Sequence, residues 1–396
     1  MPIPSRPARP PACPGARFPR IVSTAALCLV ALLATALSPP LHAQADDVQA
    51  APAATLDDGP YVFRVDGSGL EALWVCAGEM VRVVQPPAAG RGIAPRCGFP
   101  HPAVVPSALA DPESVDLGDR RIVALSDIHG QYDLMLRLLR AHAVIDDDDN
   151  WSLGRDHLVI TGDVFDRGPQ VNEVFWMLFR LQQQAHEAGG AVHFLLGNHE
   201  TMVLYGDLRY IHPRYVEVAR VLGRSYPDLY GADSVIGGWL RTRPVLLKLG
   251  DTLFLHGGIA PESLDLVERM DETNAAYRAS LGVAKGTVQA DPATARLYSG
   301  KRSPIWYRGY FNGDLSTQAV EALVDRLGLA RIVVGHTTMD EVVSFHEGRI
   351  VAIDSGIKRG QSGQLLFIDG GQLSRGLLDG SREPVPARHA APEDKD

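Results

Sequence analysis

The stretch Gly162-Asp163-Val164-Phe165-Asp166-Arg167-Gly168 places two carboxylates and one guanidinium between two glycines. It follows residues 157–161, an apolar run that predicts a buried strand. Glycines at a strand end allow a sharp turn and close approach to a ligand, so Asp163, Asp166 and Arg167 would project from a loop. Taken alone, such an acid-rich turn is more often a solvated loop than a site, so its meaning depends on the rest of the chain.

Four other apolar runs end in the same kind of residue. In each of them an Asp, His or Asn lies within two residues of a glycine. The residues are Asp127 and His129, Asn198 and His199, His256, and His336. A single histidine at a strand end is usually a packing residue, but several histidines and acids in matching positions predict a shared site. Carboxylate, amide and imidazole ligands together favour Mn, Fe or Zn over Ca or Mg.

Strand and helix patterns alternate around these positions. Apolar strands are predicted at 121–126, 157–161 and 191–196, with helices at 132–142 and 171–188 between them. This βαβ alternation predicts an α/β fold, in which helices cover a sheet and the site lies at the carboxyl ends of the strands.

The second half of the chain has a different pattern. Strand pairs around short turns predict hairpins at 245–256 and 342–353, and another strand at 364–368 precedes an Asp-Gly-Gly turn. Two long intervals, 201–243 and 261–310, carry mixed helical patterns and are expected to be helical insertions near the rim of the site.

Three sequence blocks resemble the signature blocks of the calcineurin-like metallophosphoesterases, specifically the phosphoprotein phosphatase family. They are Asp127-Ile128-His129-Gly130, the opening stretch 162–168, and Gly197-Asn198-His199-Glu200. His256 and His336 match the two later histidines of that family, so the resemblance spans residues 121–337. The start Asp58-Gly59-Pro60-Tyr61-Val62-Phe63 resembles the bacterial Shewanella-like phosphatases. The resemblance implies a β-sandwich core flanked by helices.

The resemblance also implies a role for each site residue. One metal ion would be held by Asp127, His129 and Asp163, and a second by Asp163, Asn198, His256 and His336. His199 would be the general acid and Asp166 its orienting partner. Arg167 would bind phosphate, together with Arg308 of the run Ile305-Trp306-Tyr307-Arg308-Gly309 or, alternatively, Arg302. Glu200 would support the loop from behind.

The implied activity is hydrolysis of phosphomonoesters by direct attack of a metal-bridging hydroxide. The substrate would be a phosphoprotein or phosphopeptide carrying phosphotyrosine or phosphoserine/threonine, or a small phosphoester. The cofactors would be two divalent or trivalent transition metal ions, with Mn favoured over Fe and Zn. Residues 352–356 depart from the aromatic stretch of eukaryotic members, which leaves the substrate preference open. The alternatives are a symmetrical dinucleoside tetraphosphate hydrolase and a metal-binding scaffold without turnover.

The amino terminus has the layout of a signal peptide. Arg6, Arg9, Arg17 and Arg20 precede an apolar run at 21–37, followed by small residues near Ala43. Cleavage of residues 1–43 predicts a periplasmic or secreted protein without a membrane span, and an uncleaved segment would be a membrane anchor. Because cleavage removes four arginines and no acids, the net charge would move from −9 to −13, which makes nucleic acid an unsuitable partner.

The remaining chain is expected to fall into four parts. A flexible linker at 44–57 leads to a small N-terminal β extension at 58–110, then to the catalytic domain at 111–378 and a disordered tail at 379–396. Cys76 and Cys97, the two cysteines outside the signal region, predict a disulfide in an exported protein. Two unlinked thiols are the alternative.

Overall fold

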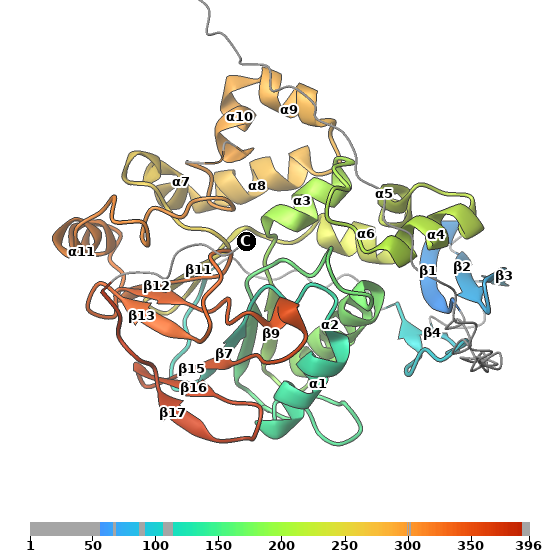
Figure 1. Ribbon diagram of the computed structural model, residues 1–396, viewed down its shortest axis with the longest axis horizontal. Coiled ribbons are helices and arrows are strands. Elements are labelled where there is room, and N and C mark those ends of the chain that lie inside the picture. Colours follow the sequence, from blue (N-terminus) through green and yellow to red (C-terminus); the bar gives the residue numbers. More distant parts are fainter. Residues whose placement is uncertain are drawn as a thin grey trace, which may run out of the picture. The chain divides into compact units, whose positions relative to one another are not determined.

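Two six-stranded sheets form the core of the computed structural model, which describes residues 56–65, 69–86, 92–105, 114–298, 300 and 302–389 (Figure 1). The predicted signal peptide at 1–43 and the linker residues 44–55 lie outside these residues. Leu56 and Asp57, at the end of the predicted linker, are hydrogen-bonded to the Ala77-Gly78 turn, because Gly78 donates to the Leu56 carbonyl at 2.9 Å and Ala77 donates to Asp57 at 2.7 Å.

The first sheet has the strand order β17-β16-β15-β7-β8-β9. Its parallel part is β7 (Ile122–Leu125), β8 (His157–Ile160) and β9 (Ala191–Phe194). Its antiparallel part is β15 (Leu365–Asp369), β16 (Gln372–Gly376) and β17 (Arg382–Pro384). The parallel part holds the predicted βαβ units.

The second sheet has the order β13-β14-β12-β11-β10-β6. Its strands are β6 (Ser114–Val115), β10 (Leu246–Leu249), β11 (Thr252–Leu255), β12 (Arg331–Val334), β13 (Val343–Phe345) and β14 (Ile350–Ala352). β10 and β11 form one predicted hairpin and β13 and β14 form another, while β11 and β12 run parallel.

Apolar residues fill both faces of these sheets. Ile122 and Ala124 of β7 belong to a buried cluster between the sheets together with Val333 and Val351, whereas Val123 and Leu125 belong to the cluster on the helical side. A strand that is buried on both faces reads as a continuous apolar run, which explains why these strands were visible in the sequence. The predicted α/β sandwich is confirmed.

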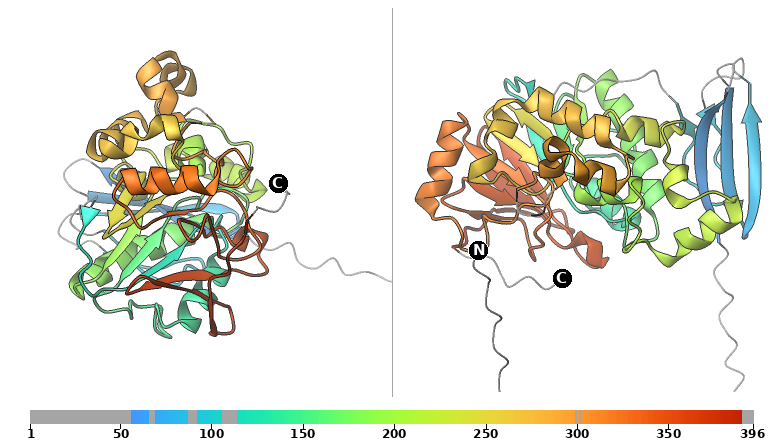
Figure 2. Two further views of the ribbon diagram at one scale, coloured as in Figure 1. Left: turned by 90° about the vertical axis from the view of Figure 1, so that its left-hand side faces the viewer. Right: turned by 90° about the horizontal axis from the view of Figure 1, so that it is seen from above.

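Helices cover the outer faces and form the two insertions (Figures 1 and 2). α1 (Tyr132–Ala141) and α2 (Val171–Glu187) follow β7 and β8, and α11 (Thr317–Arg326) precedes β12. The first insertion contains α3 (Asn198–Leu204), α4 (Pro213–Leu222), α5 (Tyr226–Leu229) and α6 (Val235–Leu240). The second contains η3 (Pro261–Ser263), α7 (Asp265–Glu268), α8 (Met270–Ser280), α9 (Lys285–Ala290) and α10 (Pro292–Tyr298).

The N-terminal extension is a three-stranded antiparallel sheet of β1 (Asp58–Val65), β2 (Gly69–Cys76) and β3 (Glu79–Gln85). It belongs to the same compact unit as the sandwich. Trp176 of α2 donates its indole N–H to the Pro60 carbonyl at 2.9 Å, and Arg214 of α4 pairs with Asp58 at 3.1 Å. These buried contacts fix the extension to the helices beside the sandwich.

The segment after β3, within the predicted β extension at 58–110, contains a short antiparallel pair of β4 (Gly92–Ile93) and β5 (Ala103–Val104). Cys76 and Cys97 form a disulfide with a Cα–Cα distance of 5.3 Å, which confirms the predicted pairing and joins this segment to β2. Within the described part of the chain, no helix has the length and apolar character that crossing a membrane requires.

The prediction of a disordered tail from Asp379 is wrong for residues 379–389. β17 pairs with β16, and residues 386–388 then bond to β13 of the other sheet, where Ser344 donates to the Pro386 carbonyl at 2.9 Å and Arg388 donates to the Ser344 carbonyl at 2.8 Å. Arg388 and Arg375 also pair with Glu341. Backbone pairing and ion pairs order this polar segment, and neither produces an apolar pattern in the sequence.

Candidate active site

Loops that follow five strands meet at one edge of the sandwich. Asp127 and His129 follow β7, Asp163 follows β8, Asn198 follows β9, His256 follows β11 and His336 follows β12. The loops are joined through their backbones, since Asp127 donates to the Gly162 carbonyl at 3.1 Å and His129 donates to the Asp163 carbonyl at 2.9 Å. The structure thus brings together the strand ends that the sequence analysis singled out, and they come from both sheets.

The backbone at these positions is unusual. Six non-glycine residues have a positive φ between 46° and 72°, a region that side chains with a Cβ seldom adopt. They are Asp127, His129, Asp163, Asp166, Arg167 and His336. Such backbone strain persists only where the surrounding structure enforces it, and it is concentrated at functional sites in proteins.

Glycines let the loops approach one another. A Cβ at Gly197 would overlap the Asp163 carboxylate, and a Cβ at Gly335 would overlap the side chains of Ser126 and Asp127. Gly162 has a φ of 98°, and a Cβ there would overlap the backbone of Gly197. The flanking glycines were expected to admit a ligand, but these contacts show that their first effect is to let neighbouring loops pack directly on the Asp163 and Asp127 carboxylates.

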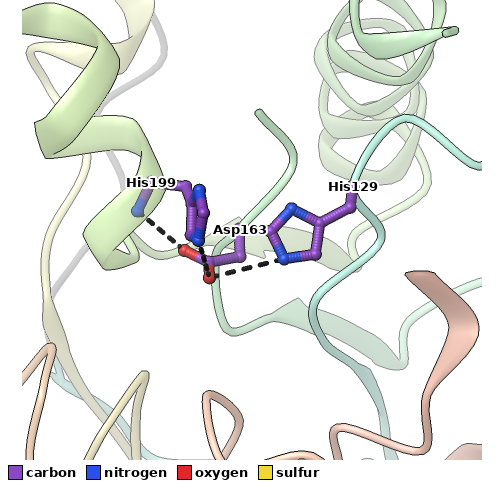
Figure 3. Close-up of side chains that lie close together, drawn as sticks. All are labelled: His129, Asp163 and His199. Carbon is purple, nitrogen blue, oxygen red and sulfur yellow. Dashed lines mark hydrogen bonds and ion pairs between the residues drawn. The ribbon is translucent and has the colours of Figure 1, made fainter. Parts of the chain in front are cut away.

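Asp163 lies at the centre of the site (Figure 3). Its Oδ2 is 3.7 Å from His129 Nε2, 3.8 Å from His199 Nε2 and 3.1 Å from His256 Nε2. Its Oδ1 accepts the backbone N–H of His199 at 3.0 Å. The carboxylate is 1% exposed, so water screens these interactions little.

Backbone carbonyls orient two of the imidazoles. His129 Nδ1 contacts the Phe165 carbonyl at 2.6 Å, and His256 Nδ1 contacts the Thr161 carbonyl at 2.8 Å. Because a carbonyl only accepts, each Nδ1 carries the proton, and in the neutral ring each Nε2 directs its lone pair toward Asp163. This second bond is typical of metal-ligating histidines.

When the His256 ring is neutral, three hydrogen-bond acceptors converge at its Nε2 with no hydrogen to share. His256 Nε2 lies 2.8 Å from Asn198 Oδ1 as well as 3.1 Å from Asp163 Oδ2. Burial lowers the pKa of His256, but the carboxylates of Asp163 and Asp127 outweigh burial and raise the pKa to about 9. Only a proton or another cation at Nε2 relieves the repulsion between these atoms.

The donor atoms fit metal ions. Candidate ligand atoms of His129, Asp163 and His199 lie within 4.8 Å of one another, and so do those of Asp163, His256 and His336. The buried Nε2 of His336 has no hydrogen-bond partner among the described residues. Two groups that share one carboxylate and offer imidazole nitrogens suit two transition metal ions bridged by Asp163.

Asp127 and His199 differ from the expected assignment in one respect. The first group contains His199, whereas the resemblance implied Asp127 as the third ligand. Asp127 faces the same cavity, where its Oδ2 accepts the backbone N–H of His336 at 3.0 Å and the Ser126 hydroxyl at 2.5 Å. Both side chains therefore line the cavity together with His129 and Asp163.

His199 forms a pair with Asp166. His199 Nδ1 is 2.6 Å from Asp166 Oδ2, so the ring directs Nε2 toward the centre of the site. Burial lowers the pKa of His199, but the Asp163 charge and the hydrogen bond to Asp166 outweigh burial and raise it. An imidazole held this way can carry a proton to a reacting oxygen.

Glu200 fixes the loop that carries Asp163. Its carboxylate, which is fully buried, accepts backbone N–H groups from Asp163 and Val164 at 2.8 Å each, from Phe165 at 3.3 Å and from Gly197 at 2.7 Å. These four bonds place Glu200 behind the site, in contact with the loop, as the sequence analysis expected.

A cavity of about 340 Å³ opens over these residues. Arg167 and Arg308 line it, whereas the alternative Arg302 is exposed and pairs with Glu262 at 3.1 Å. Five of the six expected metal ligands and His199 also line the cavity, while His256 and Asp166 are buried behind its wall. The arrangement combines a cation-attracting floor with two guanidinium groups, whose planar shape suits phosphate oxygens.

The cavity has three further lining residues that sequence reasoning missed: Tyr210, Trp306 and Lys358. Trp306 lies two positions before Arg308. Its ring packs edge to face on the His336 ring, with 5.5 Å between the two ring centres. Lys358 donates to Thr338 Oγ1 at 2.6 Å and follows the stretch 352–356 that departs from the family pattern. The only sequence signal for Trp306 and Lys358 was their position near Arg308 and near the stretch 352–356. Tyr210 had no signal in the sequence.

Comparisons with known proteins agree with this site. The calcineurin-like phosphoesterase family matches residues 120–339, more than half of the chain. The crystal structure of the cold-active protein-tyrosine phosphatase of a psychrophilic Shewanella species has a TM-score of 0.79 and 40% identity, and the match covers 83% of this chain and 99% of that chain.

Two curated relatives extend the comparison. Shewanella-like protein phosphatase 2 of Arabidopsis thaliana is 27% identical over 292 residues, covering 61% of this chain and 72% of the relative. The symmetrical bis(5'-nucleosyl)-tetraphosphatase of Chromobacterium violaceum is 32% identical over 148 residues, covering 36% of this chain and 44% of that relative. With its signature blocks gathered around one cavity, the chain belongs to the calcineurin-like phosphoesterase family and is a phosphoester hydrolase.

Proposed function

We propose that this protein is a two-metal phosphatase that hydrolyses phosphomonoesters on proteins or peptides. The observation that carries the proposal is the position of Asp163 between two groups of imidazole nitrogens, with its Oδ2 3.1 Å from His256 and 3.7 Å from His129. One buried carboxylate shared by two such groups is the arrangement that a bridging ligand requires.

The proposed ligands of the first ion are Asp127, His129 and Asp163. Those of the second are Asp163, Asn198, His256 and His336. We favour manganese over iron and zinc. When bound, the two ions would neutralise phosphate charge and activate water near neutral pH.

The chain's own side chains would bind the substrate and move one proton. Arg167 and Arg308 line the cavity and can each hold two phosphate oxygens in a bidentate contact. His199 would donate the proton on Nε2 to the departing oxygen, while Asp166 holds its Nδ1. Because bound metal ions would supply an activated water and His199 would supply an acid, no phosphorylated side chain is needed.

The proposed substrate class is supported by the relatives and by the shape of the cavity. One of these relatives is a protein-tyrosine phosphatase and another is a Shewanella-like protein phosphatase. Tyr210, which is 44% exposed, and Trp306 form aromatic walls beside the phosphate-binding residues. The match to the tetraphosphatase is shorter, and turnover of a dinucleoside tetraphosphate serves as the comparison in the test.

Asp163→Asn tests the two-metal site. We expect the variant to lose bound metal and more than about 100-fold in kcat/KM, because one bridging charge serves both ions. Metal content is measured by elemental analysis and activity with phosphotyrosine peptide, phosphoserine peptide and dinucleoside tetraphosphate. Unchanged metal content in Asp163→Asn would contradict the bridging role. If the wild-type protein turned over the tetraphosphate in preference to the peptides, the proposed substrate class would be wrong. Asp314→Asn, at an exposed loop position, is the matched control.

We also propose that the protein is exported through residues 1–43 and works in the periplasm or outside the cell. Support comes from the signal-peptide pattern and from the disulfide between Cys76 and Cys97, since disulfides persist in oxidising compartments. Fractionation of cells, with the amino terminus of the mature protein sequenced, tests the location and the cleavage point. Recovery of the protein from the cytoplasmic fraction with Met1 still at its amino terminus would contradict the proposed export.

A further inference from the structure

A second cavity of about 230 Å³ adjoins the catalytic cavity, and Trp306 lines both. Its other walls come from the two helical insertions. Tyr205 and Arg209 lie at the end of α3 and in the loop after it, and Lys285 and Tyr298 lie in α9 and α10. The two insertions therefore meet at a hollow that opens beside the phosphate-binding residues.

The second cavity has more positive than negative charge. Arg209 donates to both oxygens of Asp207 at 2.8 and 2.9 Å, and Lys285 lies 3.5 Å from the same carboxylate. Two cations thus share one anion. Their side chains are 61% and 48% exposed, whereas that of Asp207 is 13% exposed, so a ligand meets the cations first. This local excess contrasts with the net charge of −9 of the whole chain.

Tyr210 links the two cavities. The guanidinium of Arg167, in the catalytic cavity, lies 5.4 Å from the centre of the Tyr210 ring. The guanidinium of Arg209, in the second cavity, also lies 5.4 Å from it. A substrate whose phosphate is bound by Arg167 would therefore pass one aromatic ring before it reaches Arg209 and Lys285.

We propose that the second cavity binds an acidic side chain of the substrate, a glutamate or aspartate that flanks the phosphorylated residue. The inference rests on the proposed function, because it requires a peptide to extend from the catalytic cavity. A carboxylate would accept hydrogen bonds from Arg209 and Lys285. The aromatic walls of Tyr205, Tyr298 and Trp306 would contact the apolar stem of that side chain.

The test compares two sets of phosphopeptides that differ only in glutamate or glutamine at the flanking positions. For the wild-type protein we expect kcat/KM to be about threefold to fivefold higher with glutamate, the size expected for an exposed ion pair. Lys285→Gln and Arg209→Gln should bring this ratio toward one. The ratio is taken within each variant, so a general loss of activity cancels.

Two further variants separate this subsite from a general charge effect. Asp207→Asn should raise the ratio above the wild-type value, because it removes the carboxylate that pairs with both cations. Loss of folding would not raise this ratio. Arg220→Gln removes the same charge from α4, where Arg220 pairs with Glu217 outside both cavities, and it should leave the wild-type ratio unchanged.

The outcomes distinguish the subsite from the proposed function. The subsite would be overturned if the wild-type protein turned over both peptide sets equally, or if Lys285→Gln and Arg220→Gln gave the same ratio. Either result would leave the proposed phosphatase activity unaffected. Turnover of a small phosphomonoester without turnover of any phosphopeptide would overturn the peptide substrate, and the subsite with it.

Discussion

His199 and Asp163 are neighbours with different roles in the proposed site. The two side chains approach to 3.8 Å, yet His199 is held on its other nitrogen by Asp166 at 2.6 Å. Metal-ligating histidines bond that nitrogen to a carboxylate or to a carbonyl, as His129 and His256 do, so the Asp166 contact fits either role. The Asp163 charge and the hydrogen bond to Asp166 raise the pKa of His199, which favours the proton-donating role.

His199→Asn separates acid from ligand. We expect the variant to keep its metal and to lose about 100-fold to 10,000-fold in kcat for alkyl phosphates, whose leaving oxygen needs a proton. Aryl phosphates with acidic leaving groups should lose much less. Turnover is measured over a series of leaving groups and metal content by elemental analysis. Loss of metal in the variant would instead make His199 a ligand.

At this scale the sequence predicted which side chains gather at the site but not the whole cavity. Asp127, Asp163, Asn198 and the histidines were predictable because residue types that can bind metal recur at strand ends. Lys358 and Tyr210 were not, since a single lysine or tyrosine in a loop carries no pattern. Only folding brings them to the same cavity.

Among the elements, the turn after β8 and the start of α3 behave as one unit. Glu200 of α3 accepts two N–H groups on each carboxylate oxygen, and these donors belong to both segments. The signature block predicted that Glu200 supports the loop, whereas its four partners became visible only in the structure. The position of Asp163 therefore depends on a residue with no part in the chemistry.

Glu200→Gln should lower the free energy of unfolding by about 1–3 kcal/mol, because an amide N–H₂ would face two backbone N–H donors that the carboxylate satisfied. Thermal unfolding, monitored by circular dichroism, measures the loss. Glu272→Gln on α8, where the side chain is 72% exposed, is the control and should change stability by no more than about 0.5 kcal/mol. Equal effects of both substitutions would contradict the anchoring role.

Elements with an apolar period were predicted well and short polar ones were not. The three parallel strands β7, β8 and β9 lie within one or two residues of the expected ranges. β6 has two residues and β17 has three, and their polar residues give no period that a strand could be inferred from. Pairing with a neighbouring strand decides their conformation.

For the molecule as a whole, two buried histidines couple stability to pH. His157 Nδ1 lies 2.9 Å from His193 Nε2 at the sheet of β8 and β9. Burial lowers the pKa of His157 from 6.5 to about 4 and that of His193 from 6.5 to about 3. Below pH 6.5 the two histidines bind protons in the unfolded chain but stay neutral in the folded protein. The free energy of unfolding therefore falls as the pH falls toward 4.

His193→Gln should flatten this dependence. Between pH 5.5 and 4 the slope of unfolding free energy against pH should decrease by about one proton, or ~1.4 kcal/mol per pH unit. Denaturant unfolding at several pH values gives the slope. The same substitution at His186, whose ring is exposed on α2, serves as the control. An identical slope in the wild-type protein and the His193 variant would contradict the prediction.

Residues 379–389, the last that the structure describes, determine where the chain can be truncated or tagged. Because residues 382–384 pair with β16 and residues 386–388 bond to β13, one segment covers an edge of each sheet. A disordered tail would permit truncation at Asp379. Here such a truncation would expose both sheet edges, and exposed edge strands can pair with other molecules and cause aggregation. An affinity tag therefore belongs after Asp396, and a shortened protein should keep residue 389.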